Sequence, residues 1–294
     1  MDGIVVVDKP ADFTSFDVCA KLRGIFETKR IGHAGTLDPM ATGVLPVFIG
    51  KATKACDILP NGKKAYTASF KFGIKTDTED IWGTVLSEEE SRVKTDELIV
   101  AAKGFLGDIK QIPPMYSAIK INGQKLYSLA RKGIEVERPE RDAHIYQLDI
   151  LNFDEKSQSG EIFVICSKGT YIRTLISDIA NKLNTIGTMT ALRRDASGGF
   201  SLSEAFKIDE LQRLKEKGEL QNALISIDKA FKCYDSVVLD EKRTWLYKNG
   251  VMLRADQIGA KDDTYRIYGF NSEFLGLLQT DVKENKTKRI KNFY

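Results

Sequence analysis

The chain of 294 residues is 42% hydrophobic and 29% charged, and its formal net charge is +3. This composition provides enough apolar material for a sizeable core and excludes a chain that is disordered throughout. At about 150 residues per domain, the length suggests two domains, or one large domain with an appendage. No apolar run approaches the roughly 20 residues of a membrane span, and the first residues lack the pattern of a secretory signal, so we expect a cytoplasmic protein.

Strand and helix patterns follow one another irregularly from the N-terminus. β-branched runs and alternating apolar and polar residues predict strands at residues 3–7, 44–49, 64–72, 141–153, 160–167 and 188–193. Helical spacing predicts helices at residues 14–26, 51–59, 95–106, 125–132, 170–183 and 208–217, with Thr14 or Ser15 capping the first. Because these elements lack strict βαβ alternation, we expect a mixed α+β fold rather than a doubly wound sheet.

A shift in composition between residues 226 and 235 predicts a domain boundary, with a main body at 1–230 and a second domain at 231–294. Short alternating segments at 265–270 and 274–279 indicate that the second domain is small and rich in β-structure. Residues 283–294 hold five cations against one acid. A solvated polar tail is the simpler interpretation of that run, and a nucleic-acid contact through Lys288 and Arg289 is the alternative.

The cysteines and histidines bear on metal binding. No two cysteines form a C-x-x-C pair, so neither a zinc site nor a disulfide framework is indicated, and we expect no metal site. We interpret the cysteines as scattered core thiols and His144 as structural. The four cysteines are Cys19, Cys56, Cys166 and Cys233, and the two histidines are His33 and His144.

One segment, Gly32 to Gly43, holds three glycines, a histidine and a carboxylate in the order G-H-A-G-T-L-D-P-M-A-T-G. Glycine lets another backbone approach closely, which suits a loop around a ligand. Pro39 restricts Asp38 to an extended conformation and so places its carboxylate at a fixed point of the loop. An ordinary glycine-rich connection explains the segment equally well.

Three further segments contain polar groups near predicted element ends. Residues 168–173, K-G-T-Y-I-R, lie where a predicted strand is followed by a predicted helix, so Thr170 can cap that helix. Arg173 beside a partly buried carboxylate would keep that carboxylate ionised. The alternative for Arg173 is a surface cation on an amphipathic helix. Residues 77–80 lack the spacing of a calcium loop and are interpreted as a polar loop. By pattern alone, Tyr66 is a core residue.

Taken together in chain order, these motifs closely resemble the TruB-type tRNA pseudouridine synthases of bacteria. The similarity includes D-K-P at residues 8–10, the glycine-rich segment, K-A-Y at 64–66, P-P-M-Y-S-A at 113–118 and C-S-K-G-T-Y-I-R at 166–173. It extends from about residue 3 to residue 194. The resemblance implies the pseudouridine synthase fold, with a mixed and mainly antiparallel sheet flanked by helices, and a small PUA-like RNA-binding domain at the C-terminus.

The resemblance also implies an activity and a set of site residues. The expected reaction is isomerisation of the T-loop uridine at position 55 of tRNA, without a cofactor or a metal. Asp38 matches the catalytic aspartate, Tyr66 the tyrosine that stacks on the target base, and Arg173 the arginine that pairs with the aspartate. The expected substrate-binding residues are Lys9 and Pro10, which support the loop, His33, associated with base extrusion, Leu192 of a hydrophobic pocket, and Tyr171.

The segment at 109–136 resembles the thumb insertion of the bacterial enzymes. Its basic side chains, among them Lys125 and Lys132, are interleaved with Tyr116 and Tyr127, which suits a clamp on an RNA hairpin loop. The alternative is an exposed hairpin whose lysines keep the protein soluble. The hydroxyl of Tyr66 could accept the C5 proton of the base, provided that a neighbouring group makes this hydroxyl more acidic.

Two other functions fit part of the same pattern. The guide-RNA-dependent pseudouridine synthases of archaea and eukaryotes share the aspartate loop, but the insertion with Tyr116 and Tyr127 favours the stand-alone enzyme. An RNA-binding chaperone for tRNA folding would not need Asp38. For the preferred function we expect the T-arm of tRNA as the partner, no membrane association and a monomer.

Overall fold

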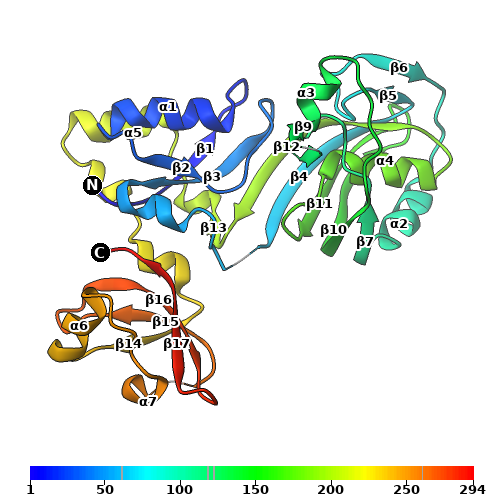
Figure 1. Ribbon diagram of the computed structural model, residues 1–294. Helices are drawn as coiled ribbons and strands as arrows, with labels where there is room; N and C mark the ends of the chain where they lie inside the picture. The colour runs from blue at the N-terminus through cyan, green and yellow to red at the C-terminus, as the bar shows by residue number, and fades with distance from the viewer. Residues whose placement is uncertain (61, 118, 122, 260) are drawn as a thin grey trace. The chain divides into compact units, whose positions relative to one another are not determined.

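The computed structural model describes residues 1–60, 62–117, 119–121, 123–259 and 261–294 (Figure 1). Contacts within the chain divide it into two compact units. Unit 1 comprises Met1–Pro39, Val44–Asn61 and Gly198–Tyr294, and unit 2 comprises Met40–Gly43 and Gly62–Ser197. The predicted boundary near residue 230 falls inside unit 1, within a 3-10 helix, and the predicted division into domains stays a prediction.

In the first part of unit 1, helices pack on three strands of a nine-stranded sheet (Figure 1). Strand β3 (Thr42–Ile49) pairs with β1 (Gly3–Lys9) and with the short β2 (Ile31–His33). Helix α1 (Ser15–Ile25) begins as predicted, because the Thr14 side chain accepts a hydrogen bond from the Asp17 amide and the Asp17 carboxylate accepts one from the Thr14 amide. The helices that follow are η1 (Gly50–Ala55), η2 (Leu202–Glu204), α5 (Ile208–Glu216), η3 (Leu220–Ala223) and η4 (Ile227–Phe231).

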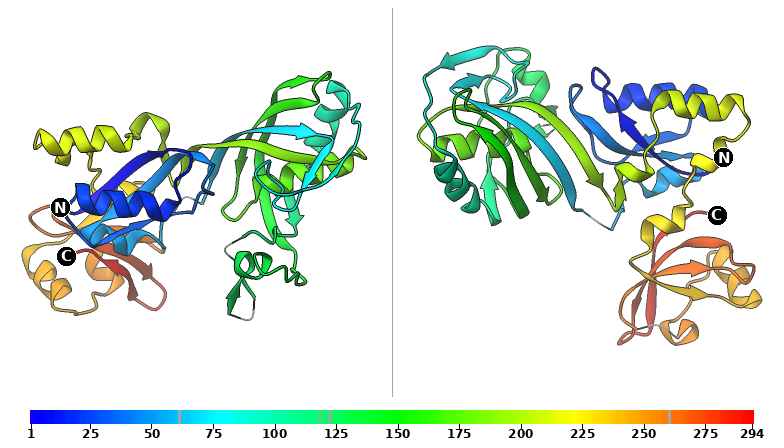
Figure 2. Two further views of the ribbon diagram at one scale, coloured as in Figure 1. Left: turned by 90° about the horizontal axis from the view of Figure 1, so that it is seen from above. Right: turned by 180° about the vertical axis from the view of Figure 1, so that it is seen from behind.

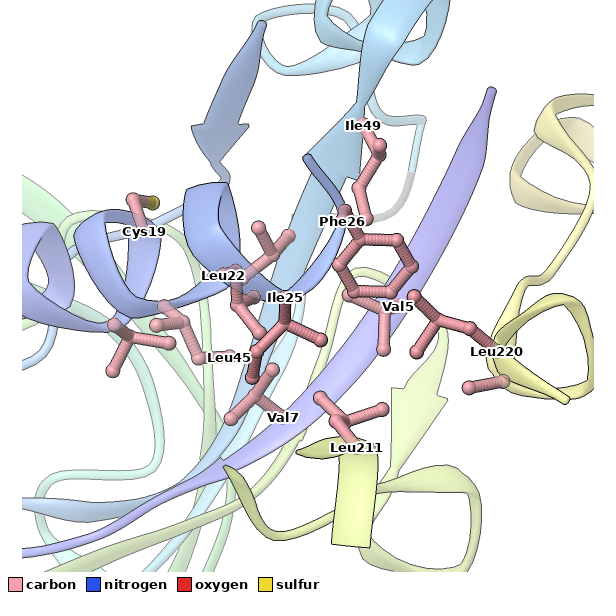
Figure 3. Close-up of a cluster of buried hydrophobic side chains, with 13 residues drawn as sticks. Val5, Val7, Cys19, Leu22, Ile25, Phe26, Leu45, Ile49, Leu211 and Leu220 are labelled. Carbon is pink, nitrogen blue, oxygen red and sulfur yellow. The ribbon is translucent and has the colours of Figure 1, made fainter. Parts of the chain in front are cut away.

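The core beneath α1 arises from the helical spacing of its apolar residues (Figure 3). Leu22 and Ile25 of α1 pack against Val7 of β1 and Leu45 of β3, and all four side chains are at most 5% exposed. Leu211 of α5 completes this cluster. The packing holds β1 and β3 in fixed positions beneath α1.

The C-terminal part of unit 1 is a second sheet with the strand order β14 (Asp235–Val238), β15 (Thr264–Tyr268), β16 (Phe274–Asp281), β17 (Lys286–Asn292). Helices α6 (Glu241–Lys248) and α7 (Ala255–Ile258) lie in the connection between β14 and β15. The prediction of a solvated C-terminal tail is wrong, because β17 pairs with β16 along its length. Phe293, which follows β17, is buried in a cluster with Phe231 and Leu277.

Unit 2 is built on an antiparallel sheet with the strand order β12 (Gly187–Ser197), β4 (Lys64–Phe72), β11 (Ser159–Cys166), β10 (Arg141–Asp154), β7 (Gly107–Gln111). Helices α2 (Thr95–Lys103) and α4 (Ile172–Lys182) pack on it, as the second view in Figure 2 shows. The alternation predicted for β4 is confirmed, since Tyr66, Ala68, Phe70 and Phe72 are all at most 5% exposed. The mixed α+β class is therefore confirmed.

Two connections of unit 2 carry smaller elements. Strands β5 (Ile74–Thr76) and β6 (Val85–Glu88) flank the loop at 77–84. Strands β8 (Lys120–Ile121) and β9 (Gln124–Lys125) and helix α3 (Leu126–Ala130) lie between β7 and β10, in the predicted insertion. Ala118 of the matched P-P-M-Y-S-A motif lies outside the described residues.

Several local predictions need correction. The expected helix at 51–59 is the shorter 3-10 helix η1, and β2 was not predicted. Tyr171, not Thr170, is the N-cap of α4, since the Thr170 hydroxyl instead donates to the Ser167 carbonyl at 3.0 Å. Cys233 is exposed rather than a core thiol. Across the described ranges, no helix combines the length and the apolar character needed to cross a membrane.

Candidate active site

In unit 1, the backbone on both sides of Asp38 is fixed by buried polar side chains. The Lys9 ammonium is fully buried and donates to the carbonyl oxygen of Pro39 at 2.9 Å, directly after Asp38. The Ser15 hydroxyl is 2.9 Å from the Leu37 amide nitrogen that donates to it, directly before Asp38. The backbone that carries the Asp38 carboxylate is therefore held in place by hydrogen bonds on both sides.

Lys9 also connects this loop to the start of the chain. Its Nζ donates to the carbonyl oxygens of Pro10 at 2.8 Å and Phe13 at 2.5 Å. An ammonium group has three donors, and backbone carbonyls satisfy all three here. The structure thus places Lys9 in contact with the aspartate loop and the Pro10 carbonyl in contact with Lys9. It places His33 on β2, opposite Val47 of β3.

The last glycine of the motif is required by a close approach of two strands within unit 2. Thr42 and Gly43 pair with Arg193 and Arg194 of β12 in parallel register. Gly43 has a φ of +100°, and a Cβ atom at this position would lie 2.2 Å from the carbonyl oxygen of Arg194. Any side chain at position 43 would therefore displace the backbone of Arg194.

Tyr66 of β4 shares one face of the sheet with residues of β12. The register places Arg194 opposite Tyr66 and Leu192 opposite Ala68, and directly opposite residues project from the same face. Arg194 is fully buried, and its guanidinium donates a hydrogen bond to the Tyr66 hydroxyl. The structure therefore places the predicted residues Tyr66 and Leu192 on one face of the sheet, along with an arginine that the sequence analysis did not select.

A second cation, Lys64, lies two residues before Tyr66 on β4. Burial, followed by the charge of Arg194, lowers the pKa of Lys64 to about 8. Burial also lowers the pKa of Arg194 from its ordinary value, and the contact with Tyr66 opposes that shift. This face of unit 2 consequently carries concentrated positive charge.

Arg173 is buried at the first turn of α4, so the alternative that it is a surface cation is wrong. Its Nη1 donates to the Thr78 carbonyl at 2.8 Å and contacts the Asp80 carboxylate at 3.4 Å. Its Nη2 donates to the Tyr116 carbonyl at 3.0 Å. Arg173 thus holds the loop after β5 and the start of the insertion against α4. The predicted pairing of Arg173 with Asp38 stays a prediction.

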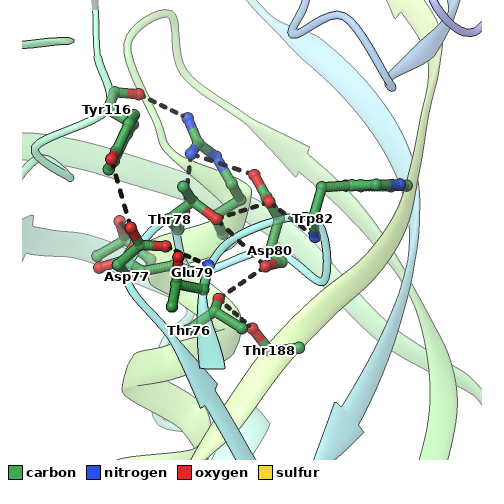
Figure 4. Close-up of polar contacts among 11 residues, drawn as sticks. Thr76, Asp77, Thr78, Glu79, Asp80, Trp82, Tyr116 and Thr188 are labelled. Carbon is green, nitrogen blue, oxygen red and sulfur yellow. Dashed lines mark hydrogen bonds and ion pairs between the residues drawn. The ribbon is translucent and has the colours of Figure 1, made fainter. Parts of the chain in front are cut away.

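Asp80 is a site residue that the sequence analysis missed. Its Oδ1 accepts from the Thr78 hydroxyl at 2.7 Å and from the Trp82 amide at 3.3 Å, while Oδ2 faces Arg173 (Figure 4). A Cβ at Gly83 would lie 2.2 Å from the Thr78 hydroxyl oxygen, so this turn requires glycine. The segment interpreted as a polar loop is therefore an ordered turn whose Asp80 carboxylate faces Arg173.

A further carboxyl group near Arg173 is that of Glu79, and the Asp178 carboxyl group lies close to Glu79. The Glu79 carboxylate accepts from the Thr174 hydroxyl at 2.7 Å, and burial raises the pKa of Glu79. Burial, with a smaller contribution from Glu79, raises the pKa of Asp178 on α4 to about 6.

The remaining predicted binding residues differ in how exposed they are. The backbone of Tyr171 is clamped by the Gln111 amide, with hydrogen bonds of 3.0 and 3.1 Å. Lys125 and Lys132 are exposed in the insertion, and the Lys125 ammonium lies 5.3 Å from the centroid of the Tyr127 ring. Lys288 is exposed on β17.

Arg289 differs from Lys288. Its Nη2 donates to the carbonyls of Tyr247 at 2.8 Å and Val251 at 2.7 Å, and its guanidinium lies 4.5 Å from the centroid of the Tyr247 ring. These contacts assign Arg289 to the interior of the C-terminal sheet. Among the described residues, no group of three or more histidine, cysteine, aspartate or glutamate side chains could hold a metal ion.

Comparison with known families covers most of the chain. The family described as TruB family pseudouridylate synthase (N terminal domain) matches residues 23–172. The tRNA pseudouridylate synthase B C-terminal domain matches residues 173–232.

Individual proteins are similar over nearly the whole length. The chain is 43% identical over 296 residues to tRNA pseudouridine synthase B of Clostridium perfringens, covering 99% of each chain. It is 44% identical over 295 residues to tRNA pseudouridine synthase B of Fusobacterium nucleatum, covering 100% of each. A solved structure titled as a Cbf5-Nop10-Gar1 complex matches with a TM-score of 0.77 and 25% identity, over 99% of this chain and 85% of that one.

Proposed function

The chain belongs to the TruB family of pseudouridylate synthases, and from this premise we propose that it converts the T-loop uridine at position 55 of tRNA to pseudouridine. The observation that supports this most directly is the loop that carries Asp38. Lys9 and Ser15 fix the backbone on both sides of that carboxylate. A carboxylate on a preorganised loop suits attack at C1′, or assisted cleavage of the glycosidic bond.

The other two catalytic residues have complementary roles in the proposal. Tyr66 stacks on the uracil once the nucleotide has been turned out of the T loop. Arg173 pairs with Asp38, because a guanidinium stabilises the charge of a neighbouring carboxylate. The base detaches from C1′ at N1, turns in the pocket and reattaches at C5, so the proposed reaction uses neither a cofactor nor a metal.

RNA binding is distributed over several elements in this proposal. Leu192 and Tyr171 line the pocket, and His33 assists extrusion of the base. The exposed Lys125 and Lys132 contact the T-arm from the insertion. The exposed Lys288 contacts tRNA beyond the loop. Monomeric action in the cytoplasm stays a prediction from the sequence.

Two alternatives differ from the proposal in what the protein needs. A guide-RNA-dependent synthase would require a second RNA, and the 43 to 44% identity to proteins named tRNA pseudouridine synthase B favours the stand-alone reaction. A tRNA chaperone without essential catalysis would not require Asp38.

One experiment separates these functions. The pure protein is incubated with an unmodified T-arm hairpin and EDTA, without guide RNA, and pseudouridine is mapped along the product. We expect modification at the single T-loop uridine and none with Asp38→Asn, which preserves the shape of the side chain and removes its charge. Modification that appears only after a guide RNA is added, or equal modification by Asp38→Asn, would overturn the proposal.

A further inference from the structure

Arg194 is the largest fully buried side chain among the described residues, and the proposed reaction gives it no role. Taking a guanidinium out of water is unfavourable, so a buried arginine is retained where strong acceptors or charges compensate. One such acceptor is the phenolic oxygen of Tyr66. The side chain predicted to stack on the base is therefore hydrogen-bonded to a buried cation.

The backbone beneath this contact is held on both sides. Gly43 lies so close to Arg194 that a Cβ atom would be 2.2 Å from the Arg194 carbonyl oxygen. After Arg194, the register with β4 shifts by one residue, and the Asp195 carboxylate accepts from the Thr67 hydroxyl at 2.8 Å. Such bulges re-aim side chains and are frequent next to active sites. The position of the Arg194 guanidinium is thus fixed relative to Tyr66.

Further positive charge lies on the face of unit 2 that Tyr66 shares with Arg194. Lys64, two positions before Tyr66 on β4, is a second largely buried cation with a pKa of about 8. Cys166, opposite Lys64 on β11, stays a neutral thiol, since burial raises its pKa to about 11. Lys168, which follows β11, adds a third positive charge close to Lys64. Negative charge that develops on the Tyr66 oxygen would be stabilised here.

We propose that Arg194 is a positioning residue that makes the Tyr66 oxygen the acceptor of the C5 proton in the last step of the isomerisation. The inference rests on the proposed function. After the base has reattached through C5, that carbon carries both C1′ and a proton, and N1 is doubly bonded to C6. The C5–H bond breaks, and its proton passes to the Tyr66 phenolate. The electron pair of that bond forms the C5=C6 double bond, while the π pair of the C6=N1 bond moves onto N1. N1 takes a proton from water, and the resulting hydroxide recovers the phenolate from the phenol.

The test compares two variants on T-arm hairpins that carry either uridine or 5-deuterouridine at the target position. Arg194→Gln keeps an N–H donor and removes the charge, while Arg194→Lys keeps the charge. Because general base catalysis contributes about 100- to 10,000-fold, we expect Arg194→Gln to lower kcat by about 10-fold or more. KM should stay nearly constant, and the deuterium isotope effect on kcat should rise above that of the wild type. Arg194→Lys should recover part of the rate.

Arg193→Gln is the matched control. Arg193 is the neighbouring arginine of β12, projects from the opposite face and contacts the Thr42 hydroxyl at 3.4 Å. The Arg193→Gln variant should leave the deuterium isotope effect at the wild-type value. Thermal unfolding of each variant verifies that it folds. Since loss of a buried cation can unfold a chain, a second measurement leaves Arg194 in place and replaces the phenol of Tyr66 by 3-fluorotyrosine, which is more acidic and should change both kcat and the isotope effect.

The outcomes are distinct. Wild-type kcat and isotope effect in folded Arg194→Gln, or a lower kcat with an unchanged isotope effect, would overturn the inference while the proposed function stands. Wild-type values with 3-fluorotyrosine at position 66 would also overturn it. Failure of the proposed function would appear separately, as absence of pseudouridine with the wild-type protein.

Discussion

The Arg173 guanidinium and the Asp80 carboxylate lie 3.4 Å apart, and their side chains are 6% and 14% exposed. They come from helix α4 and from the turn after β5, which are far apart in the sequence. Because water is largely excluded, the attraction between them is stronger than in a surface ion pair. This contact orients the arginine that is expected to act on Asp38.

Asp80→Asn removes the charge of this pair and preserves its shape. Arg173 keeps its two carbonyl acceptors, so we expect the free energy of unfolding to fall by only about 1–3 kcal/mol. The rate of pseudouridine formation should fall by roughly 10- to 100-fold, since misplacing a positioned group by 1 Å can cost about 100-fold. Single-turnover rates and filter binding on the T-arm hairpin measure this, and affinity should change little.

Asp77→Asn is the control for Asp80→Asn. The Asp77 carboxylate lies in the same turn, but its Oδ2 accepts from the Tyr116 hydroxyl at 3.3 Å and its Oδ1 accepts from the Thr84 amide at 2.7 Å. In Asp77→Asn, the amide oxygen can still accept from the Thr84 amide, and the NH2 group can donate to the Tyr116 hydroxyl oxygen. Equal rates for the two variants would contradict a specific role for Asp80.

Substitutions of Tyr66 separate its ring from its hydroxyl. Tyr66→Phe keeps the stacking surface, so it should bind the T-arm nearly as well as the wild type and lose pseudouridine formation. Tyr66→Ala should also weaken binding, by about 1–3 kcal/mol, the usual contribution of one stacked base. Dissociation constants for both variants decide this point. If the two variants bind equally, Tyr66 does not stack on the base.

Sequence patterns predicted the parts of the fold that depend on near neighbours. The Thr14 cap of α1 needs only Asp17, three residues away, and the burial of alternate residues in β4 follows from a period of two. Strand β17 was missed because its charged residues hide the alternation. Its place in the sheet depends on Phe293, which packs against distant residues such as Phe231.

The candidate site shows the same distinction. The glycine-rich motif and the family resemblance selected Asp38, but no local pattern marks Asp80, whose partner Arg173 lies 93 residues further along the chain. Arg194 was missed for a similar reason. An arginine in a strand is usually exposed, and only the register of β12 with β4 places this one beside Tyr66.

Asp178 makes stability depend on pH. Its pKa is raised from the model-compound value of 3.8 to about 6, so the native state binds its proton more tightly than the unfolded state. The free energy of unfolding should therefore fall as the pH rises from about 4 through 6. Asp178→Asn should remove this penalty and stabilise the protein at pH 8 by about 1–2 kcal/mol, because two pKa units correspond to about 2.7 kcal/mol and Asp178 is partly solvated.

Urea unfolding at pH 4.5 and pH 8 measures this effect. The benefit of Asp178→Asn should be much smaller at pH 4.5. Glu155→Gln should change the free energy of unfolding in the opposite direction. Because the Thr95 amide and the Lys94 side chain lower the pKa of Glu155 to about 2, neutralising this carboxylate should destabilise the protein at pH 8. If Asp178→Asn changed the free energy of unfolding equally at both pH values, Asp178 would not be the source of the pH dependence.

The lysines of β17 give the last prediction, which concerns tRNA beyond the T loop. Lys286 and Lys288 are exposed, whereas Arg289 binds backbone carbonyls and Lys291 lies 3.4 Å from the Asp57 carboxylate. Each phosphate contact contributes about 0.7–0.9 to the slope of log affinity against log salt concentration. If both exposed lysines contact phosphates, replacing them with glutamine should reduce the magnitude of that slope by about 1.4–1.8 on full-length tRNA.

A T-arm hairpin should respond less to the double variant, and the rate at saturating tRNA should be unchanged, because neither lysine belongs to the proposed catalytic groups. Arg289→Gln is the matched control. Its guanidinium donates to the Tyr247 and Val251 carbonyls, so its loss should lower the thermal unfolding midpoint rather than the salt slope. An unchanged slope for the lysine double variant on full-length tRNA would show that β17 displays these charges to solvent and that the C-terminal sheet binds RNA elsewhere.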